Sequence, residues 1–144
     1  MDYLYELGHR KIAHISGGYG DVNWPSKTRS RYYEAAMNKL GLDVLAGYIA
    51  DGINFDYSGG YTAMQNLLKL QDRPTAVFAA GDKLALGAIA AIRDAGMDVP
   101  KDFSVIGFDD IELARYVTPG LTTIRQNSKE LGSAAADLLV EQIN

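Results

Sequence analysis

The sequence has no cysteine and only two histidines, which excludes several kinds of site. Without cysteine the chain forms no disulfide framework and carries out no thiolate chemistry, as suits a reducing compartment. His9 and His14 stand apart from any acidic pair, so we expect no zinc site. We predict that the protein uses neither a metal ion nor a cofactor.

Long apolar runs and clusters of positive charge are also missing. No run is long enough to span a bilayer, and the amino end lacks the hydrophobic region of a signal peptide, so we expect a cytoplasmic protein without membrane contact. The formal net charge is −4 and the Lys and Arg residues are scattered, whereas a nucleic-acid surface needs a basic stripe. We therefore expect no DNA binding by this chain alone.

The sequence does contain buried strands that alternate with helices. A chain of 144 residues, 47% hydrophobic and 22% charged, forms one domain with a real core. The apolar segments at 75–80 and 105–108 have the pattern of parallel strands covered on both faces. Four strand-helix units in series predict an α/β fold with a doubly wound parallel sheet of the flavodoxin-like kind.

The expected elements follow from apolar periodicity and from Gly and Pro stops. We expect strands at residues 11–16, 46–50, 75–80, 105–108 and 121–125. We expect helices at residues 2–7, from Pro25 or Ser26 to 40, at 58–70, 84–95, 111–116 and 128–143.

Two aspartates follow the strand at 105–108, and the rest of the chain is organised around them. Asp109 and Asp110 fall beyond its carboxyl end, where open α/β sheets bind ligands. Aspartate is also a favoured helix cap, so for Asp110 a cap of the helix at 111–116 and a ligand role both stay open. For Asp109 we favour a ligand role, because it is the last residue of the strand and points into the crevice.

Arg29 lies near the first turn of the helix that ends at residue 40. A cation is unfavourable there toward the helix dipole, so its position fits better if the guanidinium faces an acceptor across the crevice. The alternative is a solvated side chain, as we expect for Arg31. Asp82 precedes the helix at 84–95 and is interpreted first as its N-cap, while it is retained as a candidate ligand residue.

Glycines and histidines near the amino end favour structural roles. Gly17, Gly18 and Gly20 mark the loop after the first strand, but their spacing lacks both the GxGxxG pattern and a P-loop lysine, so nucleotide binding is not favoured. We expect His14 to be a core histidine with a hydrogen-bond partner and His9 to be a surface or hinge residue.

Several longer segments resemble the LacI/GalR family of transcriptional regulators. VPKDFSVIGFDD followed by P-x-LTTIRQ is similar to the C-terminal signature of the family, and LGHRKIAHISGG to the segment that opens the C-terminal lobe of its effector domain. The resemblance covers essentially all 144 residues. It implies a periplasmic-binding-protein-like type I fold that binds a sugar or purine-like effector between two lobes.

The same resemblance implies a division of the chain. Residues 1–118 correspond to the C-terminal lobe, and residues 119–144 to a return segment whose strand and helix belong to the other lobe. We therefore expect a fragment of a longer regulator, in which a helix-turn-helix head outside this chain binds DNA. The apolar stripe of the last helix, together with the family's interface around Tyr61 and Leu86, predicts a homodimer.

Site residues also follow from the resemblance. The family has an effector-contacting Arg in R-x-x-G-F-x-x-A-M, and RSRYYEAAM puts Arg29 there, with Tyr32 in place of the usual Gly. An aromatic that stacks on the effector precedes G-Y-x-A-M, which corresponds to Phe55, although a lid on the core edge is the alternative. Gln126 either reaches the cleft or is an ordinary loop amide. Gly81 stands where many relatives carry Asn.

The function implied is effector sensing that modulates DNA binding by the absent head. The alternative from another class is a sugar-binding module of a transport system, which shares the fold; the missing export signal and the LTTIRQ segment count against it. No nucleophile, base and orienting residue are placed together, so we predict that the chain is not an enzyme. A phosphoacceptor enzyme is the third possibility, disfavoured because its acidic cluster belongs nearer the start of the chain.

Overall fold

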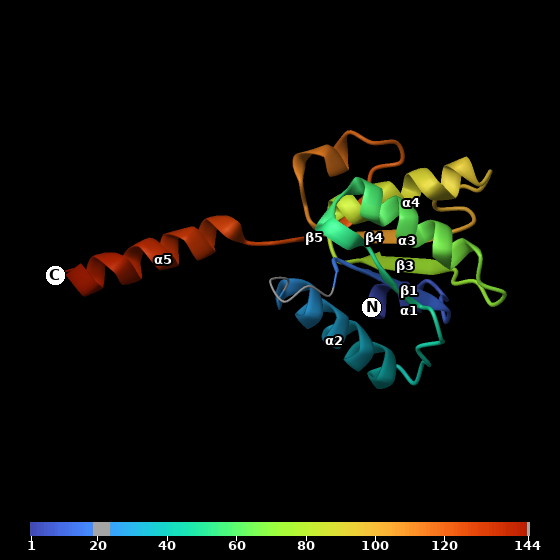
Figure 1. Ribbon diagram of the computed structural model, residues 1–144. Helices are drawn as coiled ribbons and strands as arrows, with labels where there is room; N and C mark the ends of the chain where they lie inside the picture. The colour runs from blue at the N-terminus through green and yellow to red at the C-terminus, as the bar shows by residue number, and fades with distance from the viewer. Residues whose placement is uncertain (19–23, 144) are drawn as a thin grey trace.

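The described part of the chain, residues 1–18 and 24–143 of a computed structural model, is built around one five-stranded sheet (Figure 1). The strand order is β2-β1-β3-β4-β5, and every neighbouring pair is parallel. The strands are β1 (Ile12–Ser16), β2 (Ile49–Asp51), β3 (Ala76–Ala79), β4 (Ser104–Asp109) and β5 (Thr122–Arg125). The predicted α/β fold with a parallel sheet is confirmed.

Five helices and two short 3₁₀ turns precede, connect or follow these strands in the described part of the chain. They are α1 (Asp2–Glu6), α2 (Trp24–Lys39), α3 (Tyr57–Leu68), α4 (Asp82–Asp94) and α5 (Ser128–Ile143), with short 3₁₀ turns η1 (Ile53–Phe55) and η2 (Glu112–Arg115). In Figure 1, α3 and α4 lie on one side of the sheet, and α1 and α2 on the other. None of the helices in residues 1–18 and 24–143 is both long and apolar enough to cross a membrane.

The core consists of two apolar layers, because successive strand residues point to opposite faces of the sheet. On β1, Ala13 and Ile15 belong to the larger layer, which contains the buried side chains of α3 and α4. Ile12 belongs to the smaller layer, with Tyr33 and Met37 of α2. All of β1 is buried, as a central parallel strand requires.

His14 is a core histidine, as predicted. Its ring is fully buried and stacks on Tyr33 and Phe78, with centroids 5.0 and 5.2 Å away. One ring nitrogen lies 2.9 Å from the carbonyl of Phe78 and the other 3.1 Å from Ser30 Oγ. Burial lowers the pKa of His14 to about 4, so the ring is neutral at pH 7.

His9 is more firmly held than a free surface side chain would be. Its two ring nitrogens lie 2.9 Å from the hydroxyl oxygens of Thr75 and Ser104, which precede and begin the neighbouring strands β3 and β4. The imidazole therefore ties the start of the chain to the amino ends of these strands.

The helix predicted at 111–116 is shorter, and its expected cap is absent. Only the 3₁₀ turn Glu112–Arg115 forms, and Ile111 occupies the N-cap position without a capping side chain. Asp110 instead has a backbone φ of 55°, and its carboxylate pairs with Arg115 and Arg125. The capping interpretation of Asp110 is wrong.

The return segment at residues 119–144 divides into two parts. β5 pairs with β4 along four residues, with Gly107 opposite Thr123 and Asp109 opposite Arg125. In this chain the backbone groups of β5 thus complete the present sheet, and the division of the chain between two lobes stays a prediction. The helix α5, described over its whole length, contains no buried residue and extends away from the sheet (Figure 1).

Candidate functional site

The carboxyl ends of the parallel strands meet at one edge of the sheet, and the candidate residues gather there. Phe55 follows β2, Asp82 follows β3, Asp109 ends β4 and Gln126 follows β5. Arg29 reaches the same edge from the second turn of α2. Side chains far apart in the sequence thus meet where open α/β sheets bind ligands. Gly20, predicted to belong to the loop after β1, lies outside the described residues.

Asp109 is the centre of this group. Its Oδ1 lies 3.6 Å from Nη2 of Arg29 and accepts a hydrogen bond from the Gln126 side-chain amide. Burial raises the pKa of the Asp109 carboxyl above its usual value, while the bond from Gln126 and the charge of Arg29 oppose that rise. A half-buried carboxylate that already accepts from an amide and faces a cation is suited to accept from a polar ligand.

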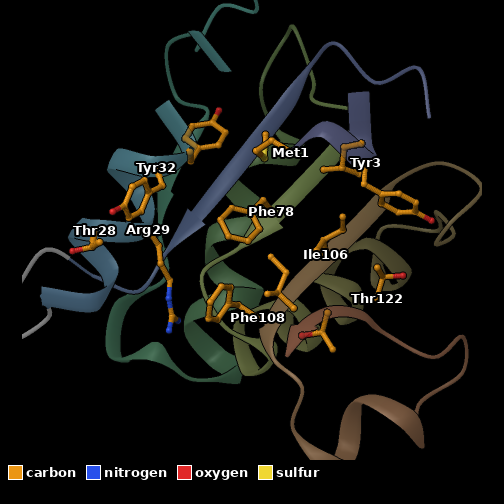
Figure 2. A pocket seen from close by; sticks show the side chains of 13 residues that line it. Met1, Tyr3, Thr28, Arg29, Tyr32, Phe78, Ile106, Phe108 and Thr122 are labelled. Atoms are coloured by element: carbon orange, nitrogen blue, oxygen red, sulfur yellow. The ribbon is translucent and has the colours of Figure 1, made fainter. Parts of the chain in front are cut away.

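Arg29 has the acceptors that its position on α2 implied. Its Nη1 donates to the carbonyl of Ala80, and Asp109 lies on its other side. The guanidinium lies 4.0 Å from the centroid of the Phe108 ring and 5.8 Å from that of Phe55 (Figure 2). Burial lowers the pKa of Arg29 and Asp109 counteracts this, so the pair is mutually stabilised. The guanidinium is thus held by backbone, carboxylate and ring faces together.

Phe55 fills the space between two glycine positions at the edge. A Cβ added at Gly17 would lie 1.8 Å from the Phe55 ring, and one added at Gly81 would lie 2.4 Å from it. The ring is half-buried and packs against the larger apolar layer. Gly81, where many relatives were expected to carry Asn, therefore makes room for this ring.

Asp82 is not the helix cap that the sequence favoured. Gly81 occupies the N-cap position of α4 without a side-chain bond, and Asp82 is the first helical residue. The Asp82 carboxylate is fully buried; it accepts from the backbone N–H of Ile111 at 2.8 Å and from the Thr123 hydroxyl at 2.5 Å. Asp82 thus lies behind the turn that carries Asp109, and both its oxygens are occupied.

Positive backbone φ angles among non-glycine residues are concentrated at this edge. Within the described part of the chain they occur at Asn54 (69°), Phe55 (56°), Asp109 (119°) and Asp110 (55°). Residues other than glycine rarely adopt positive φ angles, because the backbone is then strained. Strained backbone of this kind is often found at functional sites. Phe55 and Asp109 are among the site residues predicted from the sequence.

An apolar groove of about 630 Å³ adjoins the cluster on the side of the sheet that carries α1 and α2. Figure 2 shows Phe78, Ile106 and Phe108 along its floor and Arg29 at one end. Tyr32, which replaces the family's usual Gly, lines the groove and is 72% exposed. Sequence reasoning missed this groove, because it expected the strands at 75–80 and 105–108 to be covered on both faces, whereas Phe78, Ile106 and Phe108 line the groove.

Sequence reasoning also missed Thr123 and the carbonyl of Ala80. Thr123 is a polar residue on a strand, and its polar partner Asp82 is distant in the sequence. A backbone acceptor such as that of Ala80 leaves no trace in a sequence. Within residues 1–18 and 24–143, no three His, Cys, Asp or Glu side chains gather closely enough to hold a metal ion.

Residues 1–144, the whole chain, match the family described as periplasmic binding protein-like domain. The chain belongs to that family. It is 44% identical over 141 residues to the ribose operon repressor of Escherichia coli K12, an alignment that covers 98% of this chain and 42% of the repressor. The chain thus spans less than half the length of this curated relative.

Solved structures of LacI-family regulators share the fold. A regulatory protein of the LacI family from Chloroflexus aggregans superimposes with a TM-score of 0.89 at 34% identity, over 96% of this chain and 49% of that one. A LacI family transcriptional regulator from Enterococcus faecium with bound ribose gives a TM-score of 0.81 at 32% identity, over 98% and 51%. The resemblance to LacI/GalR regulators is confirmed.

Proposed function

We propose that this chain is the effector-sensing part of a LacI/GalR-type transcriptional regulator and that it binds a sugar or a purine-like molecule through Arg29, Asp109, Gln126 and Phe55. The observation that carries the proposal is their convergence: elements following different strands bring a carboxylate, a guanidinium, an amide and an aromatic ring to one edge of the sheet. Similarity to a ribose operon repressor and to a regulator with bound ribose supports it.

The chemistry of these groups suits a polyhydroxyl ring or a purine. Asp109 accepts hydrogen bonds from two neighbouring hydroxyls or ring N–H groups, Arg29 donates to ligand oxygens, and the Phe55 face covers an apolar surface. Arg29 and Gln126 now contact Asp109 through an ion pair and a hydrogen bond. When the ligand enters, the donor groups of both side chains become available to it. Asp82 takes a supporting role, because its carboxylate is fully buried.

A ligand held from one side needs a second surface to complete its site. We propose that residues 119–144 lead from this lobe toward a second one, with β5 in the present sheet and α5 beyond it. An effector that contacts both lobes stabilises their closed arrangement and shifts the population of DNA-binding forms. DNA binding then belongs to a head outside this chain, in a homodimer located in the cytoplasm.

A transport-type sugar-binding module is the alternative, since it has the same domain. The relative and the two solved structures compared above are a repressor and LacI-family regulators, which favours regulation over transport. These similar proteins are not enzymes, and we extend that to this chain.

The test is effector binding by the longer regulator with both lobes and its DNA-binding head. Asp109→Asn and Arg29→Ala each remove one charged hydrogen-bonding partner, which costs about 1.5 to 3 kcal/mol, or roughly ten- to a hundredfold in affinity. We expect calorimetric titration with D-ribose and with hypoxanthine to show such a loss for whichever one the parent binds, together with a lost effector response in operator binding.

The matched control is Asp72→Asn. It removes a carboxylate that pairs with Lys11 at the amino end of β1, away from the candidate edge. This variant should bind and respond like the parent. Effector binding of parental strength by both Asp109→Asn and Arg29→Ala would refute the site.

A further inference from the structure

In the turn that carries Asp109, the backbone adopts a conformation that is unfavourable for residues other than glycine. The φ angle is 119° at Asp109 and 55° at Asp110, two successive positive values. Residues with a Cβ remain in such conformations only where surrounding groups hold them. The geometry of the effector-facing carboxylate therefore depends on what fixes this turn.

Two side chains from distant elements hold the amide groups of the turn. The N–H of Asp110 donates to Thr123 Oγ1 at 3.3 Å, and the N–H of Ile111 donates to Asp82 Oδ2 at 2.8 Å. The Thr123 hydroxyl donates in turn to Asp82 Oδ1 at 2.5 Å. We call this pair, Asp82 on α4 and Thr123 on β5, the Asp82–Thr123 clamp.

Asp82 combines a buried position with a charged side chain at the start of a helix. Its carboxylate is fully buried, which is costly unless hydrogen bonds compensate. It is also the first residue of α4, where the helix dipole favours a negative charge. The carboxylate reaches β4 at Gly107, where an added Cβ would lie 2.2 Å from Oδ1. The glycine in the strand thus makes room for the clamp.

We propose that Asp82 and Thr123 are positioning residues of the effector site, because they fix the two amides that follow Asp109 and so direct its carboxylate toward Arg29 and Gln126. The proposal rests on the effector role proposed for Asp109, but the positioning itself is a property of the chain without effector. Thr123 and Gln126 belong to one segment, so a displacement of β5 moves the clamp and the amide that contacts Asp109 together.

The experiment compares three threonine variants of the 144-residue chain by amide hydrogen exchange. Thr123→Val keeps the side-chain shape and removes the two hydrogen bonds that Thr123 makes, to the Asp110 N–H and to Asp82, whereas Thr123→Ser keeps the hydroxyl. Thr122→Val makes the same change one residue earlier, where the side chain is exposed. We expect the amides of Asp110 and Ile111 to exchange roughly tenfold faster in Thr123→Val, and at the parental rate in the other two.

A second readout reports on the carboxylate itself. In the parent, burial raises the pKa of Asp109. If the turn relaxes in Thr123→Val, the carboxylate becomes more exposed and its pKa should fall toward the usual value, as followed by side-chain carbon chemical shifts. Amides in β3 and near the start of β4 should keep their protection, which separates a local effect from general loss of structure.

Asp82→Asn provides an independent variant in case Thr123→Val does not fold. It removes one acceptor and should speed exchange at Ile111. Unchanged exchange and unchanged Asp109 pKa in a folded clamp variant would overturn the proposal, as would equal effects from Thr122→Val. None of these readouts involves effector, so a parent regulator that binds neither D-ribose nor hypoxanthine would count against the proposed function and leave the clamp standing.

Discussion

Single residues decide the chemistry at the candidate edge, and Asp109 shows how. Burial and the neighbouring Asp82 raise its carboxyl pKa, while Gln126 and Arg29 act in the opposite direction. The carboxylate is therefore neither free in water nor locked in a close bidentate pair, since its distance to Arg29 is 3.6 Å. In the proposed site, such a carboxylate would exchange its protein partners for ligand hydroxyls without being left unpaired.

His14 gives a prediction about stability and pH. Its folded pKa of about 4 lies below the unfolded value of 6.5, so the unfolded chain binds a proton more readily between these values. The contribution of neutral His14 is fully present above pH 6.5 and is lost as the pH falls toward 4. We expect the free energy of unfolding to drop by about 2 kcal/mol between pH 7 and pH 5 from this group.

Urea unfolding of the parent and of His14→Gln at both pH values measures this contribution. The glutamine amide retains a hydrogen-bonding group but does not titrate, so its variant should lose less stability than the parent across the window, although it starts lower. An identical pH dependence in the two proteins would show that His14 is not the responsible group.

Asp82 and Asp109 show what the sequence could provide about the site and what it could not. The end of a buried strand identified Asp109, because an apolar run followed by a carboxylate has a defined place in an α/β sheet. Asp82 after Gly81 has the same appearance as a helix cap, and only the partner Thr123, which lies 41 residues away, reveals a different role. A local sequence pattern gives no information about a hydrogen-bond partner that is distant in the sequence.

At the scale of elements, the packing of α3 on α4 depends on closely approaching backbones. A Cβ added at Gly87 of α4 would lie 2.0 Å from the carbonyl oxygen of Tyr57 and 2.8 Å from the backbone N of Tyr61. Gly87→Ala therefore forces the helices apart. We expect a loss of about 1 to 3 kcal/mol in the free energy of unfolding, measured by urea denaturation.

Gly132→Ala is the matched control, since among the described residues no atom beyond the neighbouring backbone of α5 lies within 4 Å of its added Cβ. The same substitution there should leave stability unchanged or raise it slightly, because alanine favours a helix over glycine. A Gly87→Ala variant as stable as Gly132→Ala would contradict the close packing of α3 on α4.

The sequence predicted where strands form, but not which strand lies beside which. The segments TAVFAA and VIGF have the composition of buried parallel strands, and both form strands in the sheet. The segment TTIR also forms a strand, and it pairs with β4, a partner that its sequence did not indicate. Its residues are largely exposed at the edge of the sheet, so their pattern carries little information about which strand they pair with.

At the scale of the whole molecule, α5 is the element whose packing is incomplete. Leu131, Leu138, Leu139, Val140 and Ile143 are between 58% and 81% exposed. Apolar surface of this kind is unfavourable in water and is typical of an interface. Tyr61 and Leu86 are only partly buried on α3 and α4, and we predict that they belong to a second surface for association.

We therefore expect the chain to form a dimer in solution, with α5 buried in the interface. Sedimentation at tens of micromolar should show a dimer for the parent and a shift toward monomer for Leu138→Asp, because a charge in an apolar interface must be desolvated without a partner. Ser133→Asp places the same charge at a polar position of α5 and should not change the assembly. A parent that sediments as a monomer while the amides of α5 exchange freely would mean that the helix needs a second lobe, rather than a second copy, to cover its apolar side.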